Sequence, residues 1–206
     1  MDRSQTRIAA VILAGGRGER LGGVNKALID FGGEALIDRA LRVVAGSGCD
    51  PVLVAVGPTG LVPPAGRPIA DLPTDYAGPL AGMAAAVDAL AGEADWLLTL
   101  AVDTPFFPPD FLQRSVERAD STDCVMGCFG AQDYPTNALW RVDAIRSLPD
   151  RVRAGTAPHS LKRLAAGLRT ERLDYSRTTD DDPFLNANTP EDLRNLALRL
   201  PATKAR

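Results

Sequence analysis

The residues best suited to chemistry gather in one stretch of the sequence, ILAGGRGERLGGVNK, at residues 12–26. Three cationic side chains, Arg17, Arg20 and Lys26, are interspersed there with five glycines: Gly15, Gly16, Gly18, Gly22 and Gly23. Glycines let main-chain N–H groups approach a ligand closely, and the cations add positive charge around it. This combination predicts a binding loop for an anion of several charges, such as a polyphosphate.

A second candidate is Asp103, which directly follows the apolar run WLLTLAV at residues 96–102. Ligands of open α/β sheets bind at the carboxyl ends of the strands, where this carboxylate is expected to lie. Mg²⁺ commonly takes one or two carboxylates and completes its shell with phosphate oxygens and water. We therefore predict Asp103 as the ligand of a Mg²⁺ cofactor; the alternative is that it only caps the turn before Pro105.

Two familiar phosphate-binding patterns do not fit the loop. A P-loop has Gly before its lysine and Ser or Thr after it, whereas Lys26 lies between Asn25 and Ala27. A dinucleotide fingerprint has Gly or Ala three residues after its second glycine, and Leu21 occupies that place after Gly18. The loop is therefore neither that of a P-loop ATPase nor that of a nicotinamide-dependent dehydrogenase.

Strands and helices that alternate along the chain are expected to position these residues. Apolar runs at 8–13, 51–56 and 96–102 predict buried parallel strands, and residues 34–45 carry apolar side chains at helical spacing. A helix rich in small residues is expected at 81–91. This order predicts an open, Rossmann-like α/β fold with a mostly parallel central sheet.

The remaining elements are predicted less regularly. Residues 26–31 are expected to form a short extended piece, and the Gly- and Pro-rich residues 57–68 a loop without regular structure. Thr189 caps a last helix, with Pro190 at its first position. Further helices are expected at 109–118, 142–147 and 160–166, and further strands at 124–129, 137–140 and 169–173, with AQDYPT connecting the first two of these strands.

Composition limits the classes of protein to consider. The 206 residues, 45% of them hydrophobic, suffice for one domain with its own core, spanning residues 1–206. The 23 basic and 26 acidic residues give a net charge of −3, so neither nucleic acid nor a membrane is an expected partner. The polar N-terminus precedes an apolar run too short to span a membrane, which predicts a cytoplasmic protein.

Cysteine and histidine are too scarce for several kinds of site. Cys49, Cys124 and Cys128 form no CxxC pair, which argues against a disulfide framework or a zinc site. The single histidine, His159, excludes a site with two histidine ligands and makes a Ser-His-Asp triad improbable. We assign no chemical role to His159.

The loop resembles the signature LAGGxxxRxGxxK of nucleotidyltransferases, and further motifs resemble one family of them, the molybdenum cofactor guanylyltransferases. The resemblance runs nearly end to end. It is carried by GPLAGM at 78–83, VDTPFFPPDF at 102–111, YPTNAL at 134–139 and NANTPEDL at 186–193. It implies a Rossmann-like, three-layer nucleotidyltransferase (GT-A-like) fold.

The resemblance also implies roles for individual residues. It assigns nucleotide binding to Leu13, Ala14, Gly15, Gly16, Lys26, Asp71 and Asp103, catalysis to Arg20, Lys26 and Asp103, and binding of the pterin substrate to Gly82, Asn186 and Asn188. Two positions depart from the family pattern. Asn25 stands where Asp is common, and Ala55 stands where the second strand often ends in a nucleotide-binding Asn.

The implied reaction transfers GMP from GTP to the terminal phosphate of molybdopterin or its molybdenum-loaded form, with release of pyrophosphate. Implied protein partners are molybdenum-insertion proteins and recipient molybdoenzymes or their chaperones. Two alternatives stay open at this point. One is a cytidylyltransferase acting on the same pterin or on a sugar-like phosphate, and the other is a nucleotide-binding module without catalysis.

Overall fold

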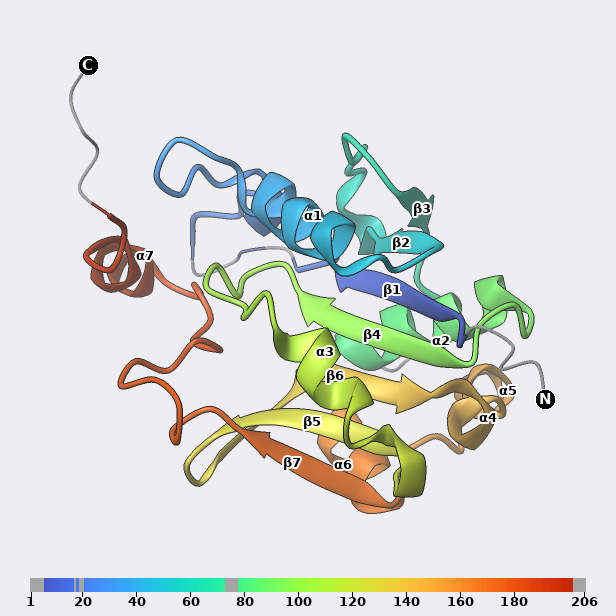
Figure 1. The fold of residues 1–206 in the computed structure, drawn as a ribbon. Helices are drawn as coiled ribbons and strands as arrows, with labels where there is room; N and C mark the ends of the chain where they lie inside the picture. The colour runs from blue at the N-terminus through green and yellow to red at the C-terminus, as the bar shows by residue number, and fades with distance from the viewer. Residues whose placement is uncertain (1–5, 17, 19–20, 73–77, 202–206) are drawn as a thin grey trace.

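A computed structural model describes residues 6–16, 18, 21–72 and 78–201, and its seven strands form one sheet in the order β3-β2-β1-β4-β6-β5-β7 (Figure 1). The first strand, β1, has the composition of a fully buried strand, IAAVIL, and lies near the centre of the sheet. The strands are β1 (Ile8–Leu13), β2 (Val52–Ala55), β3 (Arg67–Ile69), β4 (Trp96–Ala101), β5 (Cys124–Phe129), β6 (Gln132–Arg141) and β7 (Thr170–Asp174).

One strand runs against the others. β1, β2, β3 and β4 pair in parallel, as do β5 and β7, whereas β6 is antiparallel to both β4 and β5. In Figure 1 the arrows of β1 and β4 point toward α7, and the arrow of β6 points the opposite way. The predicted α/β class with a mostly parallel sheet is confirmed, and the carboxyl ends of β1 and β4 meet at one edge.

Helices cover both faces of the sheet. Alternate residues of β1 enter different cores, Ala10 and Ile12 on one face and Ala9 and Val11 on the other. The first core includes residues of α1 (Leu36–Ser47), α3 (Phe111–Val116) and α7 (Pro190–Ala197). The second includes residues of α2 (Pro79–Leu90), α4 (Val142–Ile145), α5 (Leu148–Arg153) and α6 (Leu161–Ala166). The chain thus folds in three layers.

The helix α2 owes its close packing to small side chains. Gly78 precedes it with φ 82°, and Pro79 takes the first position, where no backbone donor is required. All residues from Ala81 to Ala86 are buried, and Met83 is the only one of them with a large side chain. A Cβ on Gly82 would lie 3.0 Å from that of Ala55, so a larger residue there would push α2 away from β2.

The last helix, α7, begins as the sequence predicts. Thr189 Oγ1 accepts a hydrogen bond from Asp192 N at 3.1 Å, and Asp192 Oδ2 accepts one from Thr189 N at 2.8 Å. The two bonds form a capping box, which satisfies two donors that the helix itself leaves unpaired. Asp192 Oδ2 also accepts from Asn188 N at 3.0 Å, so the cap fixes the residues just before the helix.

Two predicted loop and strand segments are wrong in detail. Residues 26–31 do not begin as an extended piece, because Lys26–Leu28 form a 3₁₀ helix, and only Asp30 makes a β-bridge, to Ala35. Residues 57–68 are not wholly irregular. Gly57–Thr59 form a 3₁₀ helix, and β3 begins at Arg67, within the predicted loop.

Other boundaries differ toward the second half of the chain. AQDYPT is not a connection, because β6 begins at Gln132 and follows β5 through a tight hairpin. The helix α5, Leu148–Arg153, was not predicted as a separate element, and a 3₁₀ helix at Ala119–Ser121 follows α3.

Of the described helices, none is both long and apolar enough to cross a membrane. The three cysteine thiols are free and buried, and burial raises the pKa of Cys124 to about 12.

The buried hydroxyl of Thr99 provides a test of the core. It accepts from Trp140 Nε1 at 3.0 Å and donates to the carbonyl of Ala138 at 3.1 Å, and both side chains are fully buried. Thr99→Val keeps the shape but leaves the indole N–H without an acceptor. We expect a loss of about 1–3 kcal/mol, at roughly 2–4 °C of melting temperature per kcal/mol. Thr99→Ser keeps the hydroxyl and is the matched control in thermal unfolding; equal stability of the two variants would contradict this account.

Candidate active site

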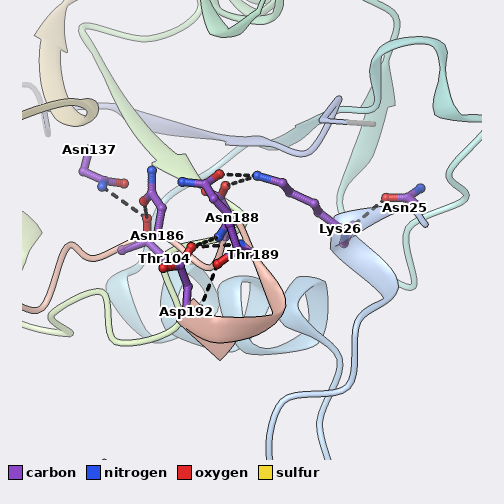
Figure 2. Close-up of polar contacts among 10 residues, drawn as sticks. Asn25, Lys26, Thr104, Asn137, Asn186, Asn188, Thr189 and Asp192 are labelled. Atoms are coloured by element: carbon purple, nitrogen blue, oxygen red, sulfur yellow. Dashed lines mark hydrogen bonds and ion pairs between the residues drawn. The ribbon is translucent and has the colours of Figure 1, made fainter. Parts of the chain in front are cut away.

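Lys26, Asp103 and Asn188 meet at the edge formed by the carboxyl ends of β1 and β4, and Figure 2 shows the side chain of Lys26 reaching Asn188. Lys26 Nζ lies 2.8 Å from Asp103 Oδ2 and also donates to Asn188 Oδ1. The Lys26 and Asp103 side chains are each only 14% exposed. Water screens such a pair little, so a cation and a carboxylate are held here in a partly dry environment.

The glycine loop packs closely against the aliphatic part of the Lys26 side chain. A Cβ on Gly16 would lie 3.6 Å from Lys26 Cδ, and one on Gly18 would lie 3.4 Å from Lys26 Cγ. Gly18 has φ +57°, and a Cβ there would lie 2.2 Å from the carbonyl oxygen of Val24. Only glycine fits that position, because any side chain would collide with the backbone that leads to Lys26.

Asn25, one of the two departures from the family pattern, has a structural role. Its Oδ1 accepts a hydrogen bond from Ala27 N at 3.0 Å and caps the 3₁₀ helix that begins at Lys26. Asp and Asn are about equally good at such a cap, because both carry an acceptor oxygen on Cγ. The departure therefore keeps the cap that aims Lys26 and removes one negative charge beside it.

Asp71 forms a second part of the site. A Cβ on Gly15 would lie 3.5 Å from Asp71 Oδ2, and one on Gly82 would lie 3.2 Å from Asp71 Oδ1. The carboxylate therefore sits between the glycine loop and α2. Its Oδ1 is buried and has no hydrogen-bond partner among the described residues. Burial raises the pKa of Asp71, because removal from water disfavours its charged form.

The turn of Gly57 encloses the same place. A Cβ on Gly57, which has φ +54°, would lie 2.7 Å from Gly15 Cα. Ala14 N donates to Ala55 O at 2.9 Å, and Val102 N donates to Leu13 O at 3.2 Å, so the main chain entering the loop is fixed by β2 and β4. Ala55, the other departure, offers only a methyl group at the end of β2, next to Gly82.

The two asparagines predicted to face the acceptor substrate lie just before α7. Ala187 N, between them, donates to Asp103 O at 2.8 Å, and Asn186 Oδ1 accepts from Thr104 Oγ1 at 3.0 Å. The segment is thus tied to the strand end that carries Asp103. Gly82 lies elsewhere, because a Cβ built on it would lie next to Leu13, Ala55 and Asp71. Arg20 lies outside the described residues.

The donor set at Asp103 fits a phosphate-bound divalent cation. No group of three or more His, Cys, Asp or Glu side chains that could hold a metal ion occurs within the described ranges. A single carboxylate is enough for Mg²⁺ when phosphate oxygens and water complete the shell. Lys26 Nζ is the cation on Asp103 in this structure, so the carboxylate is already arranged to face positive charge.

Sequence reasoning assigned no role at the site to three residues that position it. Asn137 is fully buried, Thr104 is 5% exposed, and Asp192 forms the capping box that holds Asn188. A signal existed for two of them. Asn137 is a polar residue next to the apolar Ala138, Leu139 and Trp140 of a strand, and Asp192 stands three residues after Thr189, as a capping box requires.

Known proteins resemble this chain in sequence. The family described as "MobA-like NTP transferase domain" matches residues 10–173. The chain is similar to a molybdenum cofactor guanylyltransferase from Acidiphilium cryptum, with 35% identity over 93% of this chain and 95% of the relative. The guanylyltransferase of that name from Rhodobacter capsulatus is 36% identical over 94% of this chain and 97% of its own length.

Solved structures share the fold. Molybdopterin-guanine dinucleotide biosynthesis protein A from Archaeoglobus fulgidus has a TM-score of 0.70 and 20% identity, covering 93% of this chain and 97% of its own. A manganese complex of a Mycobacterium tuberculosis protein has a TM-score of 0.70 and 16% identity, covering 95% of this chain and 100% of its own. The predicted three-layer nucleotidyltransferase fold is thereby confirmed.

Asp71 Oδ1, which is buried without a hydrogen-bond partner among the described residues, gives a prediction with two opposite effects. Asp71→Asn removes a charge that partial burial makes unfavourable, so we expect a higher melting temperature at neutral pH and weaker nucleotide binding. A raised pKa means that the destabilisation by Asp71 is full above its folded pKa and disappears below the unfolded value of about 3.9. The stabilisation by Asp71→Asn should therefore shrink as pH falls. Asp150→Asn, at an exposed carboxylate, is the control; a destabilised Asp71→Asn would refute the account.

Proposed function

Because the chain belongs to the MobA-like NTP transferase family, we propose that it is a molybdenum cofactor guanylyltransferase. It transfers GMP from GTP to the terminal phosphate of molybdopterin, with or without molybdenum, and releases pyrophosphate. The whole chain acts as one nucleotidyltransferase domain. The proposal extends to this chain the activity named for relatives that cover nearly its full length.

The observation that carries the proposal is the buried contact of Lys26 with Asp103, behind a glycine loop at the carboxyl ends of β1 and β4. The loop supplies main-chain donors, Lys26 supplies positive charge, and Asp103 supplies an oxygen ligand for a cation. Phosphoryl-transfer enzymes need little covalent chemistry from the protein and depend on positioning and charge neutralisation. These three features meet that requirement.

The reaction is an in-line displacement at the α-phosphorus of GTP. An oxygen of the acceptor's terminal phosphate forms the new bond, and the bond from the α-phosphorus to the bridging oxygen of pyrophosphate breaks. Lys26 turns from Asp103 toward the phosphates and stabilises the charge that develops there. Arg20, which the resemblance places in the same loop, adds positive charge. Asn188 Oδ1 continues to accept a hydrogen bond from Lys26 during this movement.

Asp103, together with the nucleotide phosphates, would hold a divalent cation, Mg²⁺ in this proposal. When bound it neutralises phosphate charge and acts as a Lewis acid on the phosphoryl oxygens. The residues' own contribution is the orientation of Asp103. Its main chain is fixed by Ala187 N, and its neighbour Thr104 is fixed by hydrogen bonds of its hydroxyl.

Asp71 supports the choice of guanine. Guanine presents the N1–H and N2–H₂ donors, and the unpartnered Asp71 Oδ1 is an acceptor buried beside Gly15 and Gly82. Cytosine has a smaller donor set, so it would leave part of such an acceptor pocket unmatched, which costs about 1–3 kcal/mol for each buried group. The base is therefore read in part by Asp71, in agreement with the contact to GTP that the resemblance implies.

Partners and location follow from this activity. The substrates are GTP and molybdopterin, and the product is handed to molybdoenzymes or their chaperones in the cytoplasm, with molybdenum-insertion proteins as further partners. The relatives' names support the two substrates. The protein partners and the compartment rest on the resemblance and on the sequence.

Nucleotide selectivity tests the proposal. We expect GTP with Mg²⁺ to raise the melting temperature more than CTP, ATP or UTP, and pyrophosphate to appear when molybdopterin is added. A ligand at about 100 times its dissociation constant stabilises the folded state by about 2.7 kcal/mol, which thermal unfolding detects readily. Preference for CTP would identify a cytidylyltransferase. Binding of GTP without pyrophosphate release would indicate a non-catalytic module.

Substitution of Asp103 tests the catalytic assignment. Asp103→Asn keeps the shape and an acceptor for Lys26 but removes the charge, so we expect turnover at saturating GTP to fall by two decades or more. Each tenfold loss corresponds to about 1.4 kcal/mol at the transition state. His159→Ala is the control, because His159 is exposed at the start of α6 and has no assigned role. Near-normal turnover of Asp103→Asn would remove Asp103 from the reaction.

A further inference from the structure

A chain of three hydrogen bonds runs from β4 to the segment before α7, and Figure 2 shows the part of it that joins Asn137, Thr104 and Asn186. Ala101 N donates to Asn137 Oδ1 at 3.0 Å, and Asn137 Nδ2 donates to Thr104 Oγ1 at 3.3 Å. Thr104 Oγ1 in turn donates to Asn186 Oδ1 at 3.0 Å. Asn137 is 0% exposed and Thr104 is 5% exposed, so water does not compete for these bonds.

Asn137 takes the place of a strand partner. The registered pairing of β4 with β6 ends at Thr99 and Ala138, and beyond that point the two strands separate. The N–H of Ala101 therefore needs another acceptor, which the Asn137 side chain supplies. The bond lies two residues before Asp103, and the bond to Thr104 lies one residue after it.

The direction of every bond in this chain is determined by its first donor. A main-chain N–H can only donate, so the oxygen of Asn137 must face Ala101, and its NH₂ group must face Thr104. The Thr104 hydroxyl has one proton, and because it accepts from Asn137 it is free to donate to Asn186. The oxygen of Asn186 is thereby turned toward Thr104, and its NH₂ group is turned away.

The NH₂ group of Asn186 is left available as a donor. Within the part of the chain that the structure describes, no hydrogen bond from Asn186 Nδ2 is formed, and the side chain is only partly buried. The neighbouring segment also carries Asn188 at Lys26 and fixes Asp103 O through Ala187 N. An anionic oxygen placed beside Lys26 would find this donor on the same segment.

We propose that Asn137 is a positioning residue, which sets the amide orientation of Asn186 so that its NH₂ group donates to a phosphate oxygen of the acceptor substrate. The inference rests on the proposed function, because that function supplies a phosphorylated acceptor. Asn137 itself touches no substrate. Its effect passes through the Thr104 hydroxyl.

Asn137→Asp tests the direction of the relay. The substitution keeps an oxygen for Ala101 N but replaces the NH₂ donor by an acceptor, so the Thr104 proton is drawn to position 137. Asn186 must then turn its NH₂ group to Thr104 and present its oxygen to the substrate. We expect KM for molybdopterin to rise about tenfold or more, with stabilisation by GTP unchanged, because a hydrogen bond to a charged group is lost.

A double-mutant cycle separates positioning from structural damage. In the Asn186→Ala background, Asn137→Asp should raise KM for molybdopterin no further, because the group on which it acts is gone. Additive effects of the two substitutions, or an unchanged KM in Asn137→Asp, would overturn the proposal. If Asn137→Asp does not fold, Thr104→Val and Thr104→Ser decide instead. The valine variant must show the rise in KM, and the serine variant must restore affinity toward the parent value.

Turnover by the parent protein separates a failure of the proposed function from a failure of the role proposed for Asn137. Pyrophosphate release by the parent with GTP and molybdopterin upholds the proposed function, and the variants then judge the relay alone. No release by the parent would reject the proposed function, and with it the acceptor for Asn186.

Discussion

The contact between Lys26 and Asp103 is the interaction on which the rest of the site depends. It joins the loop after β1 to the end of β4, and Asn188 adds a residue from near the far end of the described chain. A largely buried ion pair contributes little net stability, since desolvation offsets most of the attraction. Removal of one partner is nevertheless destabilising, because it leaves the other charge buried without compensation. The arrangement therefore keeps both charges close at little net gain in stability, which fits the proposal that each exchanges the other for a new partner, phosphate for Lys26 and a cation for Asp103.

The parallel half of the sheet explains why much of this was predictable. Continuous apolar runs defined β1, β2 and β4, and neighbouring parallel strands bring their carboxyl ends to one edge, so Lys26 and Asp103 were expected to converge. The cap at Thr189 was likewise predictable, because it depends on residues close in sequence. The missing partner of Asp71 was not, since it results from the packing of α2, β2 and the loop, which no local pattern encodes.

The strand β6 shows where local patterns mislead. Pro135 and its polar neighbours indicated a connection, yet they lie within the strand. Proline is tolerated there because the pairing with β4 does not reach beyond Ala138 and the pairing with β5 is shifted near Gly127. The same separation of strands creates the need for the Asn137 side chain, so a feature that obscured the strand in the sequence also supplies a link to the site.

The helix α7 buries little of its surface against the rest of the protein. Leu196 is its only fully buried residue, whereas α2 buries most of its length. Segments with few buried apolar contacts open locally at a lower free energy than the sheet they cover. Asn186 and Asn188 precede this helix but are held by their own hydrogen bonds to Thr104 and Lys26, and Ala187 between them is fully buried. Local opening of α7 is therefore expected to stop at the capping box, so amide hydrogen exchange would separate the helix from the segment that carries the two asparagines.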